Sequence, residues 1–127
     1  MDYKKHTQWS DPQEYEQHLL ALPEEPVAFA DALENFVIHH AAARHLGFAV
    51  PAYAESDRNL RVLSTILKVI IERDNRELTA HRDLPDYFYA TCRDFALLAV
   101  SMFRTRGCAA RLRVGFVNYL KKGYWED

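Results

Sequence analysis

Two cysteines lie on either side of one predicted helix, and their positions allow different chemistry. Cys92 follows Thr91, a common N-cap residue, and opens an apolar run that continues to Phe103. The first turn of a helix presents unpaired N–H groups and the positive end of the helix dipole, which favour a thiolate over a thiol. Arg93 adds a positive charge that Asp94 partly opposes. Cys92 is therefore a candidate nucleophile, and the alternative is a small side chain packed beneath the helix start.

Cys108 lies beyond the same helix, after Gly107, which is expected to end it. Neither a cap nor the positive end of a dipole favours its thiolate, so we interpret Cys108 as structural. Because no export signal is evident, two free thiols are a better interpretation than a disulfide. Neither cysteine has a partner at C-x-x-C spacing, so we expect no zinc site.

Three histidines on one predicted helix raise the question of a metal site. His39, His40 and His45 are one, five and six residues apart. Ligands on one helical face need a spacing of three or four, so we expect no metal there. All six histidines of the chain precede Cys92 in the sequence.

Basic residues gather near the end of the chain, interleaved with aromatic ones. A nucleic-acid surface would have this composition, but no binding motif accompanies it and the net charge of the whole chain is −2. We therefore expect a solvated strand face and no nucleic-acid partner. The basic residues are Arg104, Arg106, Arg111, Arg113, Lys121 and Lys122, with Phe116 and Tyr119 between them.

The aromatic run Tyr87-Phe88-Tyr89 lies just before Cys92. These rings could line a substrate cleft, or they could fold back and cover the core, and the sequence leaves both readings open.

Four segments carry helix signals, and they must position these residues. They run from Asp11 to about Leu22, from Val27 to about His45, from about Leu60 to Ile71 with Ser56 or Asp57 as N-cap, and from near Thr91 through Phe103. Gly47 and Gly107 are expected to end the second and fourth helices, and residues 81–89 to form a loop.

The chain end carries a strand pattern. Leu112, Val114 and Phe116 alternate with Arg111 and Arg113, a period of two. Residues 118–123 resemble a hairpin connection into a second strand. We therefore expect an α+β fold, with a mostly helical layer over about 11–106 followed by a β-hairpin over about 110–127. The edge of that hairpin is expected to be exposed.

The composition is that of an ordinary globular domain. The chain has 127 residues, of which 49% are hydrophobic and 27% charged, enough for one core in a single domain spanning 1–127. No stretch approaches the roughly 20 apolar residues of a membrane span. We expect a cytoplasmic protein without membrane contact.

Three motifs in succession resemble the transglutaminase-like superfamily. The run Cys92-Arg93-Asp94-Phe95-Ala96 opens a helix, which ends in Phe103-Arg104-Thr105-Arg106-Gly107 and leads to the alternating Leu112-Arg113-Val114-Gly115-Phe116. The sequence departs from the family at Ala90-Thr91, where a glycine is frequent, and at Cys108-Ala109, where Ile-Pro is usual. The resemblance covers residues 91–116.

The resemblance implies a papain-like core, incomplete in this chain. Cys92 would attack an amide or acyl group of a protein or peptide substrate and form a thioester, with no metal or organic cofactor. The family also uses a histidine and an aspartate on strands after the cysteine helix, and no position here matches them. We therefore expect the amino-terminal part of such an enzyme, truncated and inactive alone. The alternative is a non-catalytic helical module that forms homo-oligomers through its exposed sheet edge.

Overall fold

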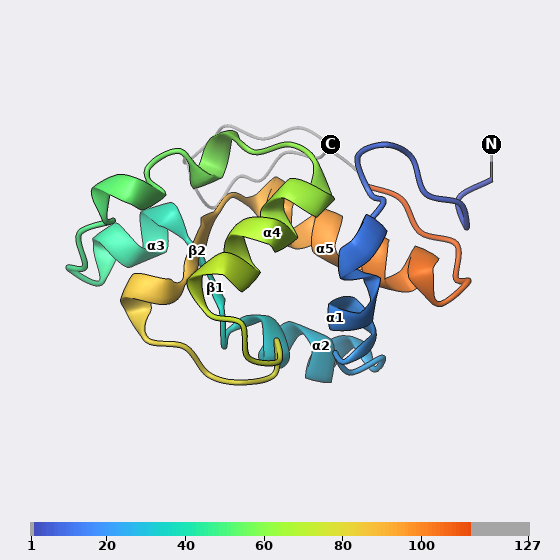
Figure 1. Cartoon of the computed structure of the whole chain (residues 1–127), viewed down its shortest axis with the longest axis horizontal. Coiled ribbons are helices and arrows are strands. Elements are labelled where there is room, and N and C mark those ends of the chain that lie inside the picture. Colours follow the sequence, from blue (N-terminus) through green and yellow to red (C-terminus); the bar gives the residue numbers. More distant parts are fainter. Residues whose placement is uncertain (1, 113–127) are drawn as a thin grey trace, which may run out of the picture.

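The computed structural model describes residues 2–112, which form an α+β arrangement (Figure 1). The elements are η1 (Gln13–Tyr15), α1 (Glu16–Leu20), α2 (Pro26–Leu33), β1 (Val37–His39), α3 (His40–His45), η2 (Ala52–Ala54), η3 (Asp57–Asn59), α4 (Leu63–Arg73), η4 (Leu84–Asp86), β2 (Phe88–Ala90) and α5 (Cys92–Thr105), where η marks a 3₁₀ turn. The predicted α+β class is confirmed. The predicted hairpin falls almost wholly on residues 113–127, outside the described part, and residues 110–112 do not belong to a strand.

The first predicted helix is confirmed in place but is shorter than expected. The Asp11 carboxylate accepts the N–H of Gln13 at 2.9 Å, as a residue at a helix start does. The chain then forms η1 and the short α1, which ends at Leu20. Leu19 on α1 and Leu22 beyond it are buried in the core.

The prediction of one helix from Val27 to His45 is wrong. The first part is α2, but the N–H groups of residues 34, 35 and 36 bond to carbonyls three residues back and end the helix. The chain then extends as β1, and α3 begins at His40. The N–H of Phe88 donates to the carbonyl of Phe36 at 2.8 Å. Pairing with a strand far along the chain overrides the local helical period, and no window of the sequence contains that information.

The two strands form a parallel sheet, which the sequence did not predict. Val37 pairs with Phe88, Ile38 with Tyr89, and His39 with Ala90. Parallel strands carry their carboxyl ends at the same edge of a sheet, so the starts of α3 and α5 lie near one another (Figure 1). This edge is where open α/β sheets commonly place their sites.

Alternate residues of the second strand face two different apolar clusters, as the period of a strand requires. Phe88 and Ala90 belong to the main core, with buried residues of α1, α2, α4 and α5. Tyr87 and Tyr89 belong to a smaller cluster with Ala43 of α3. Both faces of β2 are therefore covered, which fixes the direction from which the chain enters α5.

The predicted cap of the third helix is also wrong. α4 begins at Leu63, whose N–H is accepted by the carbonyl of Trp9 at 2.9 Å. Asp57 lies instead in η3, where its side chain is buried and pairs with Arg73 at the end of α4 through two bonds of 2.6 and 2.7 Å. The same carboxylate accepts the N–H of Tyr89 at 3.0 Å. One buried ion pair therefore ties α4 to the strand that leads to Cys92.

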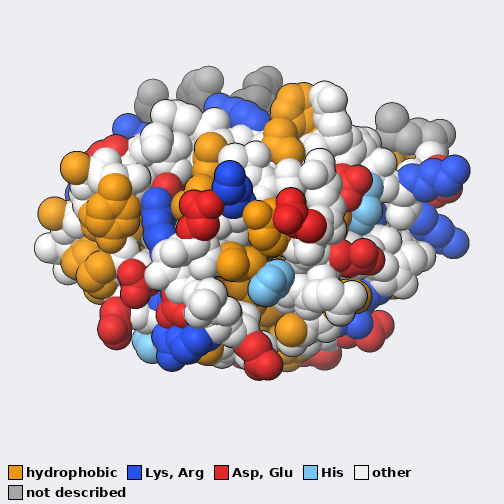
Figure 2. Space-filling view, in the orientation of Figure 1, with side chains coloured by type: hydrophobic (Ala, Val, Ile, Leu, Met, Phe, Trp, Pro, Cys, Tyr) orange, Lys and Arg blue, Asp and Glu red, His pale blue; other side chains and the backbone are white. Residues whose placement is uncertain are grey.

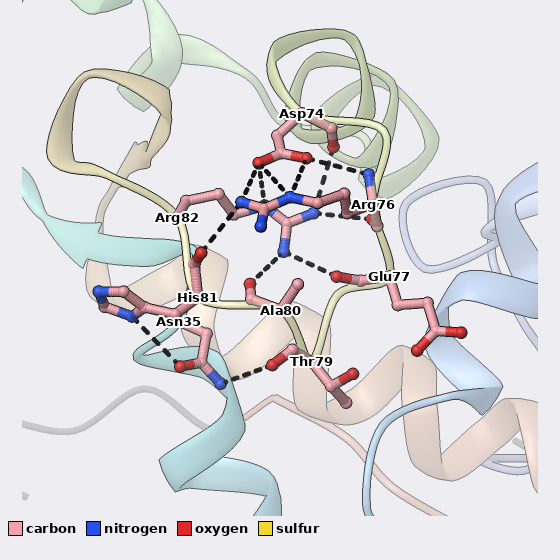
Figure 3. Close-up of polar contacts among 8 residues, drawn as sticks. All are labelled: Asn35, Asp74, Arg76, Glu77, Thr79, Ala80, His81 and Arg82. Carbon is pink, nitrogen blue, oxygen red and sulfur yellow. Dashed lines mark hydrogen bonds and ion pairs between the residues drawn. The ribbon is translucent and has the colours of Figure 1, made fainter.

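The connection between α4 and β2 is wound around Arg82, which is fully buried (Figure 3). Its guanidinium donates to four backbone carbonyls at 2.7–3.2 Å, those of Asp74, Arg76, Glu77 and Ala80. The backbone N–H of Arg82 donates to the carbonyl of Asn35 at 2.9 Å. A buried arginine with this many acceptors fixes a segment that has no regular secondary structure of its own.

Candidate functional site

Cys92 is the first residue of α5, as the sequence predicts. Thr91 precedes it as N-cap in an extended conformation, because β2 runs directly into the helix. The Cys92 side chain is exposed and is not in a disulfide. The reading in which this thiol is packed beneath the helix start is therefore excluded.

The residues that follow Cys92 hold the helix start in place. The Asp94 carboxylate reaches back and accepts the N–H of Thr91 at 2.9 Å and its hydroxyl at 3.1 Å, the arrangement of a capping box. Burial raises the pKa of Asp94, and the hydrogen bonds from Thr91 oppose that shift. The helix start is thus rigid, and it carries a carboxylate that is shielded from water.

Two buried polar atoms beside Cys92 have no hydrogen-bond partner within the described residues. They are Oδ1 of Asp94 and Nη1 of Arg93, which lie 4.0 Å apart. The other nitrogen, Nη2 of Arg93, donates to the carbonyl of Arg61 at 3.0 Å. Native proteins leave few buried polar groups unpaired, and such groups often mark functional sites.

An apolar groove runs between α2 and α5, with Cys92 on its wall. It encloses about 570 Å³, within the range of ligand sites. Phe29 and Leu33 of α2 face Phe95 and Phe103 of α5 across it, and the Phe29 and Phe103 rings lie 6.4 Å apart. The groove offers an apolar surface beside an exposed thiol.

The aromatic run before Cys92 belongs to the core. Tyr87, Phe88 and Tyr89 are all buried. The hydroxyl of Tyr87 donates to the carbonyl of Glu34, and that of Tyr89 donates to the carbonyl of Leu84. Burial raises the pKa of Tyr87, and it raises the pKa of Tyr89 to about 12. Of the two readings that the sequence left open, the core reading is confirmed and the cleft reading is wrong.

Cys108 lies beyond the opposite end of α5. Gly107 adopts the left-handed conformation expected of a residue that ends a helix, with φ of +83°. The N–H of Cys108 donates to the carbonyl of Phe103 at 2.8 Å, and its side chain is exposed. Cys108 therefore has no place in the core, and it lines a second groove with Ala96 and Ala99.

The histidines are placed differently from what the sequence predicted. His39 ends β1 and its Nδ1 accepts the N–H of Ala41 at 3.1 Å, while the rings of His39 and His40 stack at 4.7 Å. Burial, with help from the charges of neighbouring side chains, lowers the pKa of His40. Within residues 2–112, no hydrogen bond links a histidine to Cys92, and no group of three metal-ligating side chains forms.

No pattern in the sequence indicated that His39 lies near the cysteine end of the sheet. The parallel register sets His39 opposite Ala90, two residues before Cys92. A helix was predicted across this segment, so the shared edge is visible only once β1 and β2 are paired.

The basic residues that the structure describes mostly contact backbone carbonyls. Arg106 donates to the carbonyls of Leu20 and Leu22 at 3.0 and 2.9 Å, and Arg104 to those of Tyr3 and Ala110 at 2.9 Å. The rest of the predicted basic group, apart from Arg111, lies outside the described residues. Figure 2 shows acidic and basic side chains intermingled over much of one face. None of the helices described is both long enough and apolar enough to span a bilayer.

Three comparisons, with protein-family models, with curated proteins and with solved structures, find no match for this chain. The function of the chain is therefore inferred from the geometry around Cys92 and from the resemblance carried by residues 91–116.

Proposed function

We propose that this chain carries the nucleophile of a transglutaminase-like cysteine enzyme, with Cys92 acting on amide or acyl groups of a protein or peptide substrate. One observation carries the proposal: an exposed thiol at the first position of a capped helix, on the wall of an apolar groove. The Arg93–Asp94 ion contact at 4.0 Å places a positive and a negative charge beside this thiol.

In the proposed reaction the Cys92 thiolate attacks the carbonyl carbon. A tetrahedral oxyanion forms, which N–H groups of the first helical turn stabilise. The C–N bond then breaks, the amine or ammonia leaves with a proton from a general acid, and a thioester remains. Water or an amine attacks the thioester and regenerates the thiol.

The described residues supply only part of that machinery. The six histidines of the chain all precede Cys92, and none is hydrogen-bonded to it in the described residues. No general base and no orienting carboxylate are therefore assigned among residues 2–112. Without them, Cys92 is expected to accept an activated acyl group but to release it slowly.

Cys108 is an internal control for the nucleophile, because both thiols are exposed and lie at opposite ends of one helix. We expect iodoacetamide at pH 7 to alkylate Cys92 in a Cys108→Ala variant about fivefold faster than Cys108 in a Cys92→Ala variant. Helix N-termini favour nearby negative charge through their unpaired N–H groups and their dipole, and Cys108 lacks such surroundings. In 8 M urea the two alkylation rates should converge, because the unfolded chain no longer has the helix start that favours the reaction of Cys92. Equal rates in the native protein would rule out an activated Cys92.

Acyl transfer is tested with p-nitrophenyl acetate, whose leaving group needs no general acid. We expect a burst of nitrophenolate and an acetyl thioester on Cys92, followed by slow turnover. The burst should be lost in Cys92→Ala and retained in Cys108→Ala. Mass spectrometry that found acetyl groups equally on both cysteines would contradict the proposal.

The second candidate, a non-catalytic module that self-associates, rests on a different observation. The groove of Cys92 and the groove of Cys108 share Ala96, Ala99 and Phe103, so apolar surface extends along much of α5. The sheet edge first expected to mediate association lies outside the described residues. Size-exclusion chromatography with light scattering separates the candidates, because a monomer at all concentrations would contradict self-association.

A further inference from the structure

A second pocket lies on another side of α5, between that helix and the amino-terminal segment. It encloses about 350 Å³, and its wall includes three arginines, Arg93, Arg104 and Arg111, together with Tyr3 and Trp9. Among residues 2–112, no aspartate or glutamate lines it. Three guanidinium groups around one small cavity repel one another, so an anion between them is favoured.

Two of these arginines form no ion pair within residues 2–112. Arg104 and Arg111 are absent from every carboxylate contact there, whereas Arg73, Arg76, Arg82, Arg93 and Arg106 each have one. Arginine is almost always charged in proteins, so within the described part of the chain these are two charges at one pocket without an acidic partner.

Both guanidinium groups are held in place while keeping donors free. Arg104 donates through Nε to two carbonyls and through Nη1 to the Ser10 hydroxyl at 3.2 Å, which leaves Nη2 without a partner in the described residues. Arg111 lies over the Tyr3 ring at 5.3 Å and donates to its hydroxyl at 3.2 Å. A ligand that bound here would lose little affinity to ordering these side chains.

The pocket also presents a flat apolar surface. Trp9 is 45% exposed, although its backbone is fixed by the bond from Leu63 to its carbonyl. An exposed indole on a fixed backbone is suited to stacking against a planar ring.

We propose that this pocket binds a small phosphate ester, such as a mononucleotide, with its phosphate at Arg104 and Arg111 and its ring against Trp9. The proposal is independent of the chemistry of Cys92. The free Nη2 of Arg104 and the free donors of Arg111 match the charge and the several acceptor oxygens of a phosphate better than those of a single carboxylate.

Trp9 fluorescence provides the test. The chain has two tryptophans, so a Trp125→Phe variant leaves Trp9 as the only tryptophan, and excitation at about 295 nm avoids the tyrosines. We expect AMP to quench it saturably, inorganic phosphate to compete, and adenosine to bind at least tenfold more weakly because it lacks the charged hydrogen bonds. Competition by benzoate as strong as that by phosphate would identify a general carboxylate site and overturn the phosphate assignment.

Arg111→Gln should weaken AMP binding about tenfold or more, while the matched charge loss Arg58→Gln should change it little. Arg58 is exposed on η3 and does not line the pocket. Arg111→Lys keeps the charge and loses the forked geometry, so we expect it to bind AMP with intermediate affinity. It replaces Arg111→Gln in the test if that variant proves unstable. Absence of saturable quenching, or equal effects of Arg111→Gln and Arg58→Gln, would overturn the proposal.

Discussion

At the residue scale, the buried charges of this protein are fixed by hydrogen bonds, and two of the exceptions lie at the candidate site. Arg82 and Asp57 satisfy most of their polar atoms with backbone groups or with a charged partner. Arg93 and Asp94 each keep one buried atom unpaired in the described residues. Arg82 also keeps its Nε without a hydrogen bond in the described residues, so such an atom does not by itself distinguish a structural residue from a functional one.

Replacement of Arg82 by Met should lower the free energy of unfolding by about 3 kcal/mol or more, because four buried carbonyls lose a charged donor. Arg76→Met is the matched control from the same loop. The Arg76 side chain is 58% exposed, and we expect a loss of under about 1 kcal/mol. Urea denaturation of both variants measures the difference, and equal losses would contradict the role given to Arg82.

His6 predicts a pH dependence. Its Nδ1 lies 3.0 Å from the Ser10 hydroxyl, whose oxygen already accepts hydrogen bonds from Thr7 and Arg104. The hydroxyl hydrogen is therefore donated to Nδ1. His6 is then neutral, and its proton is on Nε2, which faces Thr105. Burial lowers the pKa of His6; the charge of Arg104 lowers it further, while Asp11 and Glu16 oppose the shift.

The unfolded chain therefore binds this proton at a higher pH than the folded protein does. Stability from His6 is complete above the ordinary histidine pKa of about 6.5 and falls as the pH drops below it. The free energy of unfolding, measured by urea denaturation, should fall less between pH 7.5 and pH 5.5 for His6→Gln than for the unaltered protein. An equal loss would assign the effect to other histidines.

At the element scale, α5 has specific signals at both of its ends. Thr91 and Asp94 form the start, and Gly107 with φ of +83° ends the helix and turns the chain toward Cys108. The segment between α2 and α3 carries no helix start or stop signal of this strength. There the chain forms β1, because it pairs with a distant strand.

Gly107→Ala should lower the free energy of unfolding by about 1 kcal/mol, because a left-handed backbone is strained for a residue with a Cβ. The strain is purely local, since a Cβ at this position meets no atom within 4 Å. Gly107→Asn should lose less, because Asn tolerates this conformation. Thermal unfolding ranks the stability of the variants. An Asn variant that is less stable than the Ala variant would contradict the backbone explanation.

At the scale of the whole molecule, one apolar core joins elements from both ends of the described chain. Leu19, Leu67 and Leu98, from α1, α4 and α5, are fully buried in it. α4 crosses near the centre of the view, with the sheet and α5 behind it (Figure 1). Any large void at α4 should therefore weaken the positioning of Cys92 as well as the local packing.

Leu67→Ala should lower the free energy of unfolding by about 2–5 kcal/mol, the usual range for a buried leucine. Leu46→Ala, at a residue that is 74% exposed, removes the same atoms and should change it by less than about 0.5 kcal/mol. Chemical denaturation followed by circular dichroism measures both. Similar losses would mean that α4 is not central to the core.

Features whose signals lie within a few neighbouring residues could be predicted from the sequence. These are the start of α5 with Cys92 at its first position, the left-handed glycines at 47 and 107, and the helix around Leu67. Caps, apolar periods and glycine conformations act within a few residues, so a short window contains their cause.

Only the tertiary structure decided the rest. The parallel pairing of β1 with β2 replaced a predicted helix, carried Tyr87 to Tyr89 into the core, and brought His39 to the same sheet edge as Cys92. The pairing of Asp57 with Arg73 removed a predicted cap, and the arginine pocket joined Tyr3 to Arg111. These contacts join residues distant in sequence, and their free energy exists only when the whole core has assembled.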